Sequence, residues 1–115
     1  MQSQWRVFFN VKTEDKAAKL LAQVREQSGL LSVDAPLKTY HRGGYVANFV
    51  IAHQSTDWND CVVEVIEYGQ RIAHDWLLTG DVRNALDGWS TRSSISGVSA
   101  IGWSVVRPTE NVPDR

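Results

Sequence analysis

Hydrophobic and polar positions alternate first in residues 4–12, QWRVFFNVK. One side of this segment is apolar, and the other side is polar except for Phe8. The apolar side consists of Trp5, Val7, Phe9 and Val11. Because successive side chains of a strand point to opposite faces, this alternation predicts a half-buried β-strand.

The pattern then changes to helical spacing over about 14–28. Four apolar residues recur there at i, i+3, i+4 and i+7, namely Ala17, Leu20, Leu21 and Val24. Such a stripe is typical of an amphipathic helix that packs one side against a core. Thr13 precedes the segment as a suitable N-cap, and Gly29 follows it as a suitable stop.

Residues 39–55, TYHRGGYVANFVIAHQS, predict a β-hairpin. Pro36 favours an edge strand before the turn, and residues 45–53 are apolar on nearly both faces, which is typical of a central strand. Gly43-Gly44 can adopt the positive φ angles of a two-residue turn. In that register one face carries Tyr40, Arg42, Tyr45 and Phe49.

The predicted hairpin also sets the distance between its two histidines, His41 and His53. His53 lies about 25 Å along the strand from the turn, so His41 and His53 cannot form a metal or acid–base pair. We therefore interpret the turn as an exposed polar end. Tyr40 and Arg42 are kept as candidate contacts for a ligand or a partner.

A second helix is predicted over roughly 57–78, because apolar residues follow at helical spacing from Val62 to Leu77. Residues 84–96, NALDGWSTRSSIS, are rich in Ser, Gly and Asp and predict a loop, with an additional short strand near 86–90 as an alternative. GVSAIGWSVV then alternates again as a last strand.

The order β-α-β-β-α-β predicts an α+β fold of the ferredoxin-like kind. Its antiparallel sheet has four strands, or five if the short strand near 86–90 forms, with two helices on one face. We expect one domain over 1–107 and a polar tail over 108–115. The other sheet face is left open and carries Phe8, and a bare apolar sheet face indicates a partner or self-association.

Composition narrows the classes of function. The chain has 115 residues, 43% of them apolar, and a net charge of −1, which does not favour a nucleic-acid binder. Apolar runs are too short to span a membrane, the N-terminus lacks the pattern of a signal peptide, and Cys61 is the only cysteine. Together these features predict a cytoplasmic protein.

The sequence does not predict catalytic chemistry. No spacing typical of metal ligands, phosphate loops or nucleophile elbows is present, so we expect no metal, no cofactor and no enzyme activity. Cys61 is interpreted as a small, half-buried hydrophobic residue and His74 as a surface histidine. The serines at 90, 93, 94 and 96 are interpreted as part of a flexible loop.

Function is therefore inferred from surfaces. The predicted second helix carries an acidic run without intervening Lys or Arg, and two tryptophans are expected to be partly exposed beside it or after it. These candidate partner-binding residues are Asp57, Trp58, Asp60, Glu64, Glu67 and Trp89. They predict a protein-binding inhibitor, most concretely a bacterial toxin-immunity protein that masks a basic toxin domain. The alternative is a homodimeric α+β barrel formed through the open sheet face, either as a structural or regulatory subunit or as a small enzyme with a pocket between subunits.

Overall fold

The computed structural model describes residues 1–29 and 35–108. Its elements are β1 (Gln2–Phe9), α1 (Glu14–Ser28), β2 (Leu37–Thr39), β3 (Tyr45–Ala52), α2 (Trp58–Ile72), β4 (Ala73–His74), β5 (Leu77–Asp81), β6 (Ala85–Ser90), β7 (Arg92–Ser93) and β8 (Val98–Val106). The apolar run at 30–34 and the predicted tail beyond Pro108 lie outside the described residues.

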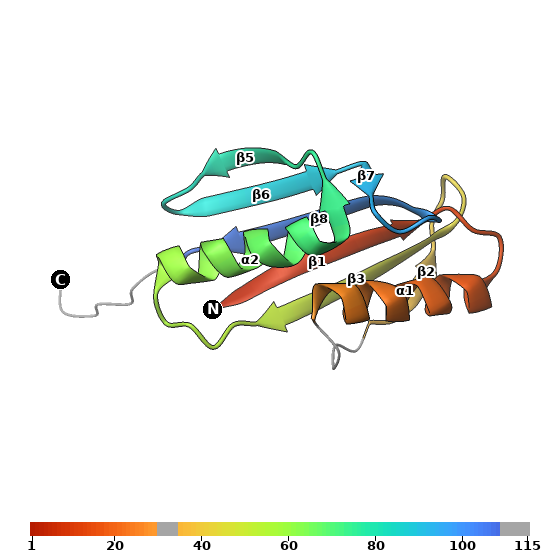
Figure 1. Ribbon diagram of the computed structural model, residues 1–115, viewed down its shortest axis with the longest axis horizontal. Helices are drawn as coiled ribbons and strands as arrows, with labels where there is room; N and C mark the ends of the chain where they lie inside the picture. Colours follow the sequence, from red (N-terminus) through yellow and green to blue (C-terminus); the bar gives the residue numbers. More distant parts are fainter. Residues whose placement is uncertain (30–34, 109–115) are drawn as a thin grey trace.

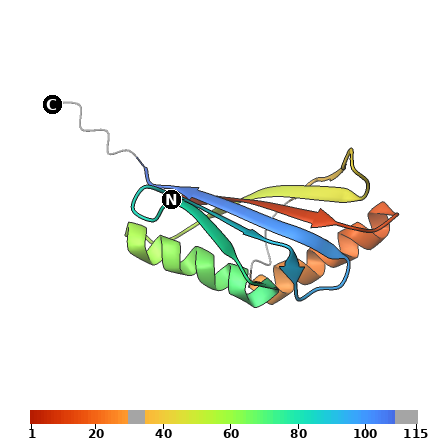
Figure 2. The same cartoon turned by 90° about the horizontal axis from the view of Figure 1, so that it is seen from above.

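Six strands form one antiparallel sheet in the order β2-β3-β1-β8-β6-β5 (Figure 1). The short strands β4 and β7 pair separately, beside the end of α2. Both helices cover the same face of the six-stranded sheet (Figure 2). The uncovered side is called the open face below.

The central strand β1 follows the predicted alternation. Trp5 pairs with Phe49 of β3 and with Trp103 of β8, and these three side chains are buried on the helix side. Gln4, Arg6 and Phe8 alternate with the buried positions and therefore lie on the open face. A strand with these faces and the unusual place of Phe8 are confirmed, but β1 spans Gln2–Phe9 instead of 4–12, and Val11 lies beyond it.

Local capping fixes where the helices begin. Thr13 accepts a hydrogen bond from the Lys16 backbone N–H at 3.3 Å, and Asp57 accepts one from Asp60 at 3.1 Å. Gly29 ends α1 in a left-handed conformation with φ of 87°. Helix α1 is thus found at its predicted place, over 14–28. Its apolar spacing, its N-cap and its terminating glycine all indicate the same bounds.

The four-stranded ferredoxin-like prediction is wrong, and so is its five-stranded variant. Helix α2 ends at Ile72, and the residues predicted to continue it form β4 and part of β5. Strands β5 and β6 form a hairpin that extends the sheet beyond β8 to six strands. The prediction of an α+β fold with two helices is confirmed.

The helical spacing of residues 73–77 is misleading for a physical reason. Asp75 has φ of 51°, which turns the chain back, and Trp76 then packs between Gly69 of α2 and Trp103 of β8. A Cβ atom on Gly69 would lie 3.0 Å from the Trp76 ring. Trp76 is therefore apolar because it packs against the core from a segment beyond the helix, and Leu77 is exposed in β5.

The predicted register of the β2–β3 hairpin is also wrong. The backbone N–H of Gly43 donates to the Tyr40 carbonyl at 2.9 Å, and the N–H of Tyr40 donates to Gly44 at 3.0 Å. Thr39 consequently pairs with Tyr45. An odd shift of register turns a strand's side chains to the opposite face, so Tyr40 lies on the open face, away from Tyr45 and Phe49.

Candidate functional site

The open face carries more than half of the exposed large hydrophobic side chains of the described residues. Among the described residues, seven large hydrophobic side chains are exposed, and the strand registers place four of them on this face. The four are Val50, Leu77, Trp89 and Val106. Water-exposed apolar groups gathered on one side of a small domain mark an interaction surface.

Three aromatic rings cross the open face as a continuous band. The ring of Phe8 meets Tyr40 edge-on, with centroids 5.0 Å apart, and meets Trp89 in the same way at 5.7 Å. Tyr40 follows β2 and Trp89 lies on β6, on opposite sides of the central strand β1 that carries Phe8. Tyr40, Phe8 and Trp89 are called the aromatic band below. Edge-to-face pairs of this kind hold each other in place.

Three residues singled out in the sequence converge here. Tyr40 and Trp89 belong to the aromatic band, and Arg42 lines a depression of about 300 Å³ together with both of them. Phe8 holds the group together, and its place on the polar side of an alternating strand was the signal that located it. Trp89 is 42% exposed, as predicted.

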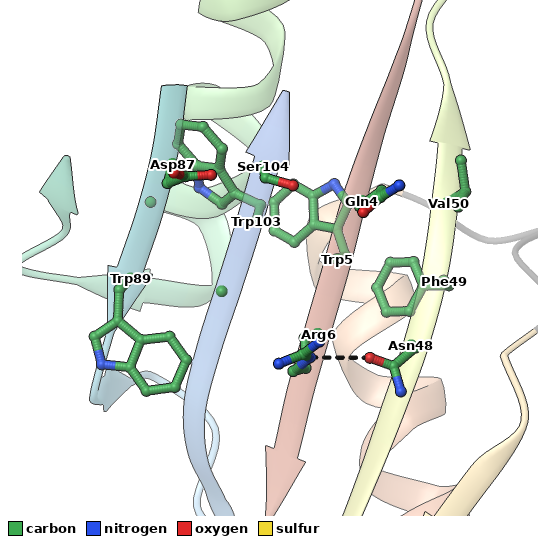
Figure 3. Close-up of a pocket in the computed structure, with 12 residues that line it drawn as sticks. Gln4, Trp5, Arg6, Asn48, Phe49, Val50, Asp87, Trp89, Trp103 and Ser104 are labelled. Carbon is green, nitrogen blue, oxygen red and sulfur yellow. Dashed lines mark hydrogen bonds between the residues drawn. The ribbon is translucent and has the colours of Figure 1, made fainter. Parts of the chain in front are cut away.

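A larger hollow of about 450 Å³ adjoins Trp89 on the same face. Figure 3 shows Trp89 and Asp87 on β6 to one side of β8, and Gln4 and Arg6 on β1 to the other. Arg6 donates a hydrogen bond from Nε to Asn48 at 3.1 Å, which holds its side chain across β1 and β3. The hollow thus has an aromatic wall and charged groups at its rim.

Two glycines leave room for the tryptophan rings on the two faces of the sheet. A Cβ atom on Gly102 would lie 2.9 Å from the ring of Trp89, and one on Gly88 would lie 2.3 Å from Trp103. Gly102 lets Trp89 lie across β8 on the open face. Gly88 lets Trp103 pack beneath β6 on the helix side, where it is buried.

The acidic residues of α2 lie on the other side of the molecule. Asp57, Asp60 and Glu67 are exposed on this helix, which covers the face opposite to Trp89. Together with Glu64 they are called the acidic helix surface below. The structure therefore does not bring this surface and Trp89 together.

Two of the candidate partner-binding residues of α2 have structural contacts. Trp58 is 5% exposed, against the expectation of partial exposure, and its indole N–H donates to the Val82 carbonyl at 2.8 Å. Glu64 accepts hydrogen bonds from Tyr68 at 2.7 Å and from His53 at 2.9 Å. Trp58 thus ties α2 to the β5–β6 turn.

The sequence analysis missed a buried polar network around His53. Its Nε2 accepts from the Ser3 hydroxyl at 2.7 Å, while its Nδ1 donates to Glu64, the direction that leaves every partner satisfied. The Ser3 oxygen also accepts from the indole N–H of Trp5 at 2.9 Å. The order Ser–His–Glu resembles a hydrolase triad in its hydrogen bonds.

The burial of Ser3 and His53 limits the chemistry that this network can perform. Ser3 is fully buried and the His53 side chain has no exposed area, so a substrate cannot reach the hydroxyl in this conformation. The contacts instead join the first strand, the end of β3 and α2. Fully paired buried polar groups of this kind specify one packing arrangement.

The network changes the proton affinity of its members. The hydrogen bond from His53 lowers the pKa of Glu64, opposed by partial burial. Burial, followed by the hydrogen bond to Glu64, raises the pKa of Tyr68 to about 12. Cys61 lies nearby in α2, is fully buried where partial burial was expected, and has its pKa raised by that burial.

Comparisons with protein families, with curated proteins and with solved structures found no match for the chain. Residues 1–29 and 35–108 contain no group of three or more His, Cys, Asp or Glu side chains placed to hold a metal ion. In the same residues, no helix has the length and apolar character needed to cross a membrane.

Proposed function

We propose that the chain is a protein-binding domain and that the open face of its sheet is the docking surface. The observation that carries this proposal is the concentration there of four of the seven exposed large hydrophobic side chains of the described residues. Burying such groups against another protein stabilises a complex by about 25 cal/mol per Å² of apolar area.

The composition of the open face supports the same proposal. Binding energy at protein interfaces concentrates in Trp, Tyr and Arg side chains near the centre of the contact. Trp89 and Tyr40 form the aromatic band with Phe8, and Arg6 and Arg42 lie beside it. The hollow next to Trp89 offers space for a side chain of the bound protein.

The more specific proposal is a toxin-immunity protein that masks a basic partner. It is supported by the acidic helix surface, whose exposed Asp57, Asp60 and Glu67 attract a positively charged protein. Since this surface and the open face point in opposite directions, the two contacts would be made separately. A masked partner then uses one surface and leaves the other available.

Capture experiments with matched variants test these proposals. The immobilised full chain is compared with Val50→Lys on the open face and Val63→Lys on the outer side of α2, two valines of similar exposure, 50% and 54%. We expect the first variant to lose the proteins captured from host lysate and the second to retain them. Retention by Val50→Lys, with circular dichroism showing both variants folded, would contradict docking at the open face.

A third variant separates the immunity proposal from the general one. Glu67→Lys reverses an exposed charge on the acidic helix surface and should release a basic partner, most strongly at low salt. Capture of a basic protein that is unchanged by Glu67→Lys would count against the masking role. It would leave docking at the open face untouched.

A further inference from the structure

We propose that the hollow beside Trp89 binds a short zwitterion, namely a free dipeptide with an apolar side chain. The inference goes beyond the proposed function, because a small ligand in this hollow does not require a protein on the open face. It is argued from the charged side chains that line the hollow, from the distance between them and from the aromatic wall beside them.

One positive and one negative side chain line the hollow. Among its described lining residues, Arg6 and Asp87 alone are charged. They lie on β1 and β6, on either side of β8 (Figure 3). Both residues are exposed, and within 1–29 and 35–108 neither makes an ion pair. The hollow therefore offers a contact to a carboxylate and a second contact to an ammonium group.

The strand registers set the distance between these two contacts. Arg6 pairs with Gly102 of β8. Asp87 pairs with Ser104, which lies two residues further along the same strand. Strands lie about 4.8 Å apart and rise about 3.3 Å per residue, so the Cα atoms of Arg6 and Asp87 are about 12 Å apart on the diagonal.

A dipeptide has its two charges at a suitable spacing. Side chains stand roughly perpendicular to a sheet, so the charged groups of Arg6 and Asp87 are separated by a distance similar to that of their Cα atoms. Two ion pairs of about 4 Å or less leave on the order of 5 Å between the ligand's own charges. An extended dipeptide spans at most about 7 Å, whereas a single amino acid carries both charges on one carbon and is too short.

A hydrogen bond positions Arg6 for a carboxylate. Its Nε donates to the Asn48 side chain at 3.1 Å, and its terminal NH2 groups have no hydrogen-bond partner among the described residues. A planar guanidinium binds a carboxylate through two parallel hydrogen bonds. The bond to Asn48 also draws Arg6 toward β3 and away from Asp87, which favours a dipeptide over a single amino acid.

Trp89 supplies an apolar wall for the side chain of the ligand. Its ring lines both this hollow and the depression beside Arg42, and so separates the two. The ring lies over Gly102, and the next residue of β8 on this face is Ser104, whose side chain is small. Sites for small ligands are cavities of about 300–1,000 Å³ with apolar walls and a few polar groups that fix orientation. The hollow, at about 450 Å³, meets this description.

Titrations with alanylphenylalanine and its blocked forms test the inference. The full chain is titrated at low salt with the free dipeptide, its N-acetyl form, its C-terminal amide and the form blocked at both ends. The indole N–H signal of Trp89 is followed by NMR. We expect the free dipeptide to shift this signal at millimolar concentration, and each single block to weaken binding about threefold or more, because it removes one exposed ion pair.

Two variants assign each charge of the ligand to its contact. Arg6→Gln should bind the free dipeptide and its amide equally, and Asp87→Asn should bind the free dipeptide and its N-acetyl form equally. Each variant should still discriminate against the other block. Val63→Lys, on the outer side of α2, is the control and should bind all four forms like the wild type.

Absence of a shift at millimolar concentration would overturn the inference, as would a blocked form that binds as well as the free dipeptide. The same conclusion would follow if Arg6→Gln or Asp87→Asn, shown by circular dichroism to be folded, kept the preferences of the wild type. If the dipeptide fails to bind while Val50→Lys abolishes capture of other proteins, the inference fails and the proposed function stands. If the dipeptide binds as expected while Val50→Lys leaves capture unchanged, the hollow is a ligand site and the open face is not the surface that binds other proteins.

Discussion

The indole ring of Trp89 lies over Gly102, so near that a Cβ atom there would be 2.9 Å from the ring carbon Cε3. From this position Trp89 reaches across β8 from β6 and meets Phe8 of β1 edge-on. The glycine is thus the reason that the aromatic band continues over the middle of the sheet. Any side chain at Gly102 must displace Trp89.

Gly102→Ala should move Trp89 away from Phe8 at little cost in stability. Trp89 is 42% exposed and can shift into solvent, so we expect the free energy of unfolding to fall by less than about 1 kcal/mol. The NMR signal of the Trp89 indole N–H, assigned by Trp89→Phe, should change position. An unchanged signal in a folded variant would contradict the contact.

Gly88→Ala is the matched test on the other face of the sheet. Its added Cβ atom would lie 2.3 Å from Trp103, which is 4% exposed and packs between Trp5 and Trp76. Because this ring is buried among other aromatic side chains and cannot shift into solvent, we expect a loss of about 1–3 kcal/mol, typical of overpacking. Urea denaturation compares the two alanine variants, and equal losses would show that Trp103 adjusts as easily as Trp89.

Local rules predicted the first strand and the first helix well. In β1 the alternation is strict, and in α1 the apolar spacing agrees with a capping Thr13 and a terminating Gly29. The prediction failed where a local pattern had two explanations. Trp76 continues the helical spacing of α2, yet it packs onto that helix from a different segment.

The strands β5 and β6 carried weaker signals. Gly80 and Gly88 lower strand propensity, and β5 is exposed at every position, so it has no alternation of buried and exposed residues to detect. In the first hairpin, the odd register shift followed from a turn that begins at Tyr40 instead of using only Gly43-Gly44. Turn geometry sets register, and a glycine pair is compatible with several turns.

The site was predictable in part. Tyr40, Arg42 and Trp89 were identified as unusual side chains, but their convergence depends on a strand order that the sequence did not specify. The network of Ser3, His53 and Glu64 was missed because its members are 50 and 11 residues apart and follow no known motif. Only the pairing of β1 with β3 brings Ser3 to the end of the strand that precedes His53.

Glu64→Gln should reduce stability near neutral pH but not in acid. The folded state lowers the pKa of Glu64, so the ionised carboxylate favours folding above its unfolded pKa, and this contribution is lost as the pH falls through the lower folded value. We expect the variant to lose about 1–2 kcal/mol near neutral pH, in line with a hydrogen bond to a charged group. The difference should vanish in acid below the folded pKa of Glu64.

Urea denaturation across this pH range provides the measurement. Glu67→Gln is the control, because it removes a carboxylate from the exposed side of the same helix. That variant should unfold like the wild type at each pH, within about 0.5 kcal/mol. A constant difference between wild type and Glu64→Gln from neutral to acid pH would show that the charge of Glu64 does not contribute through His53.

Tyr68 should keep its proton in alkali that ionises ordinary tyrosines. Burial and the hydrogen bond to Glu64 raise its pKa to about 12, above the value of about 10 in an unfolded chain. Between these values the folded state holds the proton more tightly, so stability declines as the pH rises above about 10. Phenolate absorbance of the wild type and of Tyr68→Phe should therefore coincide up to about pH 11, followed while far-ultraviolet circular dichroism shows folded protein. Excess absorbance of the wild type near pH 10 would mean that the hydroxyl of Tyr68 is not held by Glu64 in solution.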